Sequence, residues 1–236
     1  MKKLIAILLI GILLIVGISY HIVGFSLNKY KDFEQTNVLE YYHKYDDFIY
    51  TSEKDMENEN FKKLMPMVYD FFELLPDTTI REFEEKNWKI IISSEKPSYV
   101  KEIENSVDYK VGGNAEYNLR LIFLYLNNNA PEYLLSDFIH EFGHYEDWEN
   151  GLVAKSSSFE KIFKKNQGYV PNDSFSDENY HLSNTREFFA CCYKDYFLYN
   201  DELKNKAPEV YNYLGSIIWH NNSDVTAFYI RTWNYF

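Results

Sequence analysis

Hydrophobic positions in the first half of the chain alternate between helical and strand-like spacing. Residues 61–75 carry apolar side chains at helical intervals, and Pro76 is expected to end that helix. Residues 88–92 form a short β-branched run, which predicts a strand. Residues 110–126 include the run LRLIFLYL and predict one or two further strands, whereas the acidic residues 47–60 predict a connection between two helices.

Helical spacing dominates the second half of the chain. The predicted helices cover residues 131–149, 156–166, 184–199, 206–219 and 224–234. Strands followed by helices indicate an α+β fold, with a small sheet beside a helical half. No linker or internal repeat divides residues 28–236, so we expect one domain there.

The first 27 residues have the pattern of an export signal. Lys2 and Lys3 precede an apolar stretch, residues 4–25, that is long enough to span a bilayer. Lysines before such a stretch keep that end in the cytoplasm. We therefore expect residues 1–27 to be a signal peptide or a signal anchor, and the rest to be extracytoplasmic, either secreted or anchored in the membrane by residues 4–25.

Charge and cysteine content exclude two classes of protein. Asp and Glu number 36 against 24 Lys and Arg, giving a net charge of −12 without a basic cluster. Such a surface repels phosphate backbones, so nucleic acid is not an expected partner. The only two cysteines, Cys191 and Cys192, are adjacent, which rules out a disulfide framework and favours small core residues.

The predicted helix 131–149 contains the sequence His140-Glu141-Phe142-Gly143-His144. Residues four apart share one helix face, so both imidazoles can reach one ion while Glu141 lies beside it. A catalytic zinc ion takes three protein ligands and one water, so this motif is one ligand short. H-E-x-x-H also occurs by chance, so the motif indicates a zinc site only if the chain provides a third ligand.

The third ligand has one main candidate in the sequence. A metzincin pattern is excluded because Asp147 and Asn150 stand where it needs glycine and histidine. Glu187 follows a plausible helix N-cap, Asn184, and therefore falls in the first turn of the next helix. Its spacing suits a metal ligand and a capping-box glutamate equally well, so both interpretations remain open at this point.

Two segments carry a resemblance to a known family. His140-Glu141-Phe142-Gly143-His144 and Glu187-Phe188-Phe189-Ala190, with Tyr180 before the second, resemble the anthrax lethal-factor-like metallopeptidases, which include small secreted Pro-Pro endopeptidases. Weaker similarity extends over about residues 60–200. The resemblance implies a zincin-like domain, Glu187 as the third zinc ligand and Tyr180 facing the substrate carbonyl. Cys191-Cys192 depart from the family, which usually has an acidic residue after the alanine.

Together these features predict an exported zinc endopeptidase acting on a peptide or protein substrate. His140, His144 and Glu187 would hold one zinc ion, and Glu141 would take the proton of a metal-activated water. The resemblance further implies proline-containing cleavage sites. The alternative, from another class, is a catalytically inactive zincin-like domain of a toxin-related protein that binds a partner.

Other side chains carry weaker expectations. Asp147 is predicted to be a surface carboxylate rather than an orienting partner for a histidine, and His181 to be structural. Residues 111–117 fit either an exposed sheet edge or a turn, since Gly112-Gly113 permits close backbone approach. Aromatic side chains are expected near a substrate cleft, namely Trp88, Tyr117, Tyr145 and Tyr180.

Overall fold

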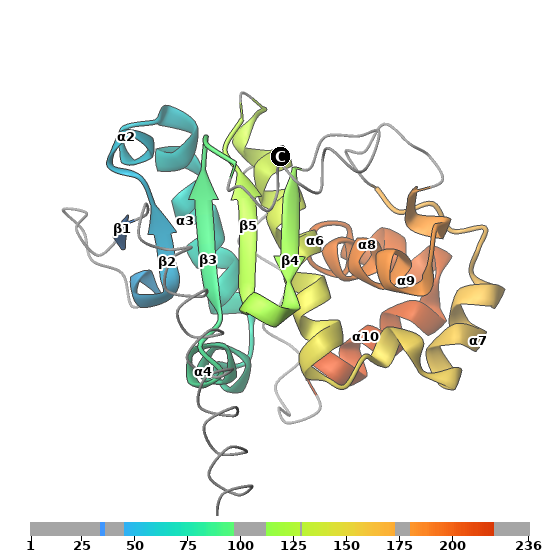
Figure 1. The fold of residues 1–236 in the computed structure, drawn as a ribbon. Helices are drawn as coiled ribbons and strands as arrows, with labels where there is room; N and C mark the ends of the chain where they lie inside the picture. Colours follow the sequence, from blue (N-terminus) through green and yellow to red (C-terminus); the bar gives the residue numbers. More distant parts are fainter. Residues whose placement is uncertain (1–33, 36–44, 97–111, 128, 173–179, 220–236) are drawn as a thin grey trace, which may run out of the picture.

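A small sheet stands beside a group of helices, with helix α6 between them (Figure 1). The computed structural model describes residues 34–35, 45–96, 112–127, 129–172 and 180–219. The predicted α+β architecture is confirmed. The hydrophobic segment 1–27 and the predicted helix 224–234 lie outside the described residues.

The described strands form one mixed sheet in the order β1-β2-β3-β5-β4. Their bounds are β1 Glu34–Gln35, β2 Ile49–Thr51, β3 Lys89–Ser93, β4 Gly113–Glu116 and β5 Leu121–Tyr125. Strands β2, β3 and β5 are parallel, while β1 and β4 pair antiparallel at the two ends. Among the described strands β4 is therefore an edge, which agrees with the edge interpretation of residues 111–117 rather than the turn.

The helices lie mainly after the sheet in sequence, as expected. They are α2 Glu53–Met56, α3 Glu59–Leu74, α4 Asp77–Glu85, α6 Pro131–Glu149, α7 Ser157–Lys165, α8 Thr185–Leu198, α9 Asn200–Lys206 and α10 Pro208–Ile218. Short 3₁₀ turns are η2 Asp46–Phe48, η3 Tyr117–Leu119, η4 Val153–Lys155 and η5 Tyr180–Leu182. Within the described ranges, no helix combines the length and apolarity that crossing a membrane requires.

Residues 47–60 were wrongly predicted as a plain connection, because they contain β2 and α2. Ile49 and Thr51 are fully buried, and the Thr51 hydroxyl donates to the Ile92 carbonyl at 2.7 Å. Because β2 is only three residues long, it gives no detectable period in the sequence, and its parallel pairing with β3 depends on residues 41 positions away. Ser52 then caps α2 by accepting the Asp55 backbone N–H.

Prolines explain two further differences from the predicted helices. Pro76 ends α3 as expected, but it also serves as the N-cap residue of α4, which was not predicted. The predicted helix 206–219 is instead two helices, since Ala207 leaves helical geometry at φ −136° and ψ 61° and Pro208 starts α10. Proline is well tolerated in the first helical turn, where its missing N–H is not needed.

Helix α3 lies behind the sheet (Figure 1), and aromatic rings pack α6 against it. Phe71 and Phe72 of α3 meet Phe138 and Phe142 of α6 edge to face, with ring centroids 5.3 Å apart for Phe71 and Phe142. All four rings are at most 1% exposed. Edge-to-face pairs add to the free energy gained by burial, so the motif-bearing helix is held rigidly on this side.

The opposite side of α6 packs closely against α8 at Gly143. A β-carbon built at Gly143 would lie 3.0 Å from the Tyr193 β-carbon and 3.1 Å from the Ala190 α-carbon. The absence of a side chain at Gly143, together with the small Ala190, therefore sets how near the two helices come.

Gly143→Ala should lower the free energy of unfolding by about 1–2 kcal/mol, because overpacking outweighs the gain in helix propensity. Urea denaturation would measure this. The matched control is Gly168→Ala, where an added β-carbon meets no atom within 4 Å, and its stability should equal that of the parent or exceed it slightly. Equal stability of the two variants would contradict the close α6–α8 contact.

Candidate metal centre

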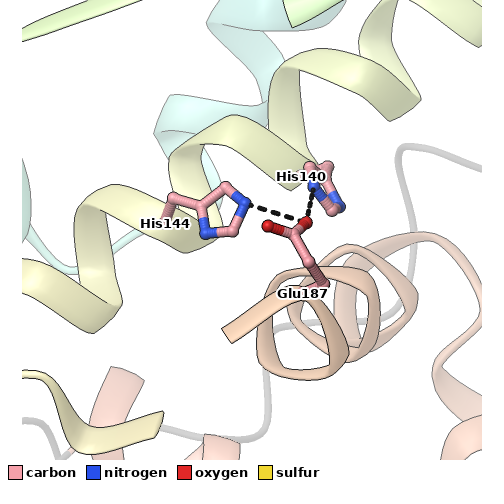
Figure 2. A group of neighbouring side chains, drawn as sticks. All are labelled: His140, His144 and Glu187. Carbon is pink, nitrogen blue, oxygen red and sulfur yellow. Dashed lines mark ion pairs between the residues drawn. The ribbon is translucent and has the colours of Figure 1, made fainter. Parts of the chain in front are cut away.

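Three side chains predicted as ligands converge between α6 and α8. Figure 2 shows His140 and His144 on α6, with the Glu187 carboxylate between them from α8. The Nε2 atoms of His140 and His144 each lie 3.3 Å from Glu187 Oε2. One ligand atom from each of the three residues lies within 4.8 Å of the others. The structure thus brings together the whole predicted ligand set.

The start of α8 explains why Glu187 points at the histidines. The Asn184 side chain caps the helix, accepting the backbone N–H groups of Arg186 and Glu187 at 2.9 and 3.1 Å. Glu187 lies in the first turn, as its spacing predicted. Its carboxylate is occupied with the two imidazoles, so of the two open interpretations the geometry favours the ligand over the capping box.

The three groups together already accommodate a positive charge. Burial lowers the pKa of His140 to about 4, which leaves that imidazole neutral. Burial also acts against a charged His144, yet the adjacent Glu187 carboxylate raises the pKa of His144 to about 9. For Glu187, burial acts to raise the pKa, but the two histidines outweigh it and hold the pKa far below its usual range. A cation at this point would replace a proton that the site already favours.

Two of the three distances between the candidate ligand atoms match those around a zinc ion. Two ligands about 2.0–2.1 Å from a tetrahedral zinc ion lie about 3.3 Å apart, which is the separation between Glu187 Oε2 and each Nε2. Two imidazole nitrogens and one carboxylate oxygen also form a common ligand set of catalytic zinc sites, with a fourth position left open. The donor atoms present therefore suit one zinc ion.

Glu141 lies beside this cluster and under the edge strand. It is only 7% exposed, and burial raises its pKa to about 8. The α-carbon of Gly113 in β4 approaches it so closely that an added β-carbon would lie 2.6 Å from the Glu141 γ-carbon. Of the two glycines expected to permit close approach, Gly113 therefore approaches Glu141 and Gly112 approaches Asp137, and the Glu141 carboxyl group lies between the sheet edge and the three candidate ligands.

Both cysteines are fully buried on α8, in agreement with their predicted role in the core. Cys191 also has a polar contact, because its Sγ lies 3.6 Å from His140 Nδ1. A histidine that binds metal through Nε2 commonly uses its other nitrogen to contact a neighbouring group. Cys191 occupies that place here.

Asp147 was wrongly predicted to lie on the surface, since its side chain is 0% exposed. Its Oδ2 accepts from Arg186 Nε at 3.1 Å, and its Oδ1 accepts from the Ala154 N–H at 2.7 Å. A carboxylate can be buried only when such partners replace water. Arg186 was not identified from the sequence; its position directly before Glu187 was the available signal.

The other residues that the sequence singled out do not belong to the ligand cluster. Tyr180 begins η5, but its side chain lies outside the described residues. His181 is buried beside the Phe188 ring and is not part of the ligand cluster. Trp88 and Tyr145 belong to the core, contrary to the expectation that they border a cleft. Tyr117 is partly exposed at the end of β4.

Comparison with known proteins agrees with this geometry. Residues 72–217 match the family model described as anthrax toxin lethal factor, N- and C-terminal domain. The fold is similar to the Pro-Pro endopeptidase PPEP-2 from Paenibacillus alvei, with a TM-score of 0.55 and 18% identity over 73% of this chain and 98% of that one. No curated protein matches the sequence. The match spans more than half of the sequence, and the chain belongs to the anthrax lethal-factor-like metallopeptidase family.

Proposed function

We propose that this protein is an exported zinc endopeptidase that hydrolyses peptide bonds. The convergence of His140, His144 and Glu187, with Glu141 buried beside them, is the observation that carries the proposal. Membership of the metallopeptidase family and the fold shared with a Pro-Pro endopeptidase support it.

Each group has a definite task in this proposal. A zinc ion held by the two histidines and Glu187 would polarise the peptide carbonyl and lower the pKa of a water molecule toward about 7. Glu141 accepts the proton of the attacking water and passes it to the leaving amine. The Tyr180 hydroxyl donates to the developing oxyanion, a contribution of about 3 kcal/mol for one well-aimed donor.

The edge strand offers a way to hold the substrate. A peptide in extended form can add to β4, whose outer side carries no strand among the described residues. Gly113 keeps this strand against Glu141, so a peptide paired with it would pass close to the base. Both the scissile bond and the base would then be fixed by the same strand.

The alternative is a zincin-like domain that binds a partner without turnover. This alternative has support, because the family model that matches this chain describes two different domains of lethal factor, and a match to it does not by itself identify a catalytic domain. A domain that no longer catalyses hydrolysis would be expected to have lost one or more of the metal ligands or the glutamate base. His140, Glu141, His144 and Glu187 are all retained, which favours the enzyme.

Glu141→Gln should bind one zinc ion as the parent does and lose about 10²–10⁴-fold in turnover, because only the base is removed. His144→Ala should lose both zinc and activity. The measurements are metal content by mass spectrometry and cleavage of a peptide library. Glu146→Gln, a change of another buried glutamate on α6, is the control and should keep both. A parent that binds zinc but cleaves nothing would favour the partner-binding alternative, and an active Glu141→Gln would exclude the base.

Proline at the scissile bond is the proposed specificity, following the activity named for PPEP-2. Proline has no N–H, so a proline-rich peptide cannot donate at every position of an edge strand and needs aromatic contacts instead. Trp148, which is 37% exposed and stacks on Tyr117 at 4.7 Å beside the end of β4, supplies such a surface. In a library varied on both sides of the cut, products should concentrate at bonds with proline. Cleavage mainly at bonds without proline would remove this preference and leave the endopeptidase standing.

Export is proposed from Lys2, Lys3 and the apolar residues 4–25. Protease added to intact cells should digest the part after about residue 28, or that part should be found in the medium. Replacing both lysines by glutamate should lower the exported fraction, because the charge bias that orients the segment is reversed. Protection of the parent protein inside the cytoplasm would contradict export.

A further inference from the structure

A partly buried ion pair, with Asp147 at 0% and Arg186 at 24% side-chain exposure, connects the helix that carries the two histidines to the helix that carries Glu187. Asp147 of α6 is fully buried, and Arg186 of α8 donates Nε–H to it at 3.1 Å. The second carboxylate oxygen is taken by the Ala154 N–H at 2.7 Å. Both oxygens are thus held, so the carboxylate has a fixed orientation.

Arg186 is fixed from a second side by the end of the edge strand. Its guanidinium carbon lies 4.5 Å from the Tyr117 ring centroid, and one terminal nitrogen donates to the Tyr117 hydroxyl. The Tyr117 ring also stacks on Trp148 of α6, with 13° between the planes. Three elements that border the metal centre, α6, α8 and the β4–η3 corner, therefore meet at one arginine.

The cost of burial makes the location of this pair informative. Removing two charges from water is expensive, and a buried ion pair often stabilises a fold no better than apolar side chains of similar size. Stability alone therefore gives little reason for a charge pair here. Its position does give one, because Arg186 immediately precedes Glu187 in the first turn of α8.

We propose that Asp147 and Arg186 are positioning residues: their ion pair fixes the start of α8 against α6 and so holds the Glu187 carboxylate at ligand distance from His140 and His144. This inference rests on the proposed zinc centre. Without the pair, the first turn of α8 keeps its Asn184 cap and the buried Phe188, but it loses the ion pair to α6 directly beside Glu187, so the carboxylate can move away from the two imidazoles. Groups that orient a metal ligand typically change metal affinity by about 10–100-fold when they are removed.

The test measures zinc affinity rather than activity, by competition with a chelating dye on the purified full chain. Asp147→Asn and Arg186→Gln should each weaken zinc binding about 10–100-fold. The double variant Asp147→Asn/Arg186→Gln should bind zinc no more weakly than the worse single variant, because one interaction is lost in all three. Both side chains are neutral in the double variant, so no unpaired charge is left buried. The double variant can therefore be measured even where a single variant unfolds.

Two further measurements separate positioning from simple fastening of the helices. With cobalt bound in place of zinc, the visible absorption bands should change in Arg186→Gln, since they report the ligand geometry. Arg186→Lys should restore zinc binding only in part, because lysine keeps the charge but not the fork that bonds Asp147 and Tyr117 together. The control Lys86→Gln removes another salt bridge to α6, Lys86 to Glu149 at 2.8 Å, and should leave zinc affinity unchanged.

Each result has a definite meaning. Zinc affinity of the variants within twofold of the parent, with a less stable metal-free protein, would overturn the positioning role and leave only a structural ion pair. A double variant that binds zinc as the parent does would overturn it as well. A parent chain that binds no zinc would instead overturn the metal centre, and this inference with it.

Discussion

The close approach of α6 and α8 is the constraint on which the rest of the site depends. Gly143 sits inside the H-E-x-x-H sequence and leaves room for Ala190 and Tyr193 of the opposite helix. A side chain at that position would force α8 away from α6 at Ala190, one turn after Glu187, whereas the two histidines lie one turn apart on α6. One residue of the motif therefore supplies no chemistry, yet decides whether the ligands can meet.

Bringing two helices this close has an electrostatic consequence. Polar groups trapped between them lose water and must find partners within the protein. Glu187 is matched with His140 and His144, Asp147 with Arg186, and His140 also contacts Cys191. The fully apolar contacts are concentrated on the other side of α6, where aromatic rings hold it to α3. The helix is thus anchored on one side and carries its polar groups on the other.

Local patterns predicted those parts of the molecule that local physics determines. The four-residue spacing of His140 and His144 and the Asn184 cap needed only helix geometry, and the α+β order followed from periodicity. Strand β2 and the buried state of Asp147 could not be read in this way. Each depends on a distant partner, β3 for the strand and Arg186, 39 residues later, for the carboxylate. A charged residue resembles a surface residue until its partner is known.

The edge strand β4 is in contact with the residues around the candidate metal centre at two points. Strand β4 touches the site at Gly113, against Glu141, and its following turn reaches Arg186 through Tyr117. A peptide paired with this edge would be aligned by the same strand that limits the position of the base. The same strand therefore contacts Glu141 directly and the start of α8 through Tyr117 and Arg186. In the proposed mechanism, the distances between the scissile bond, Glu141 and Glu187 would therefore be set by packing between β4, α6 and α8 rather than by the flexibility of single side chains.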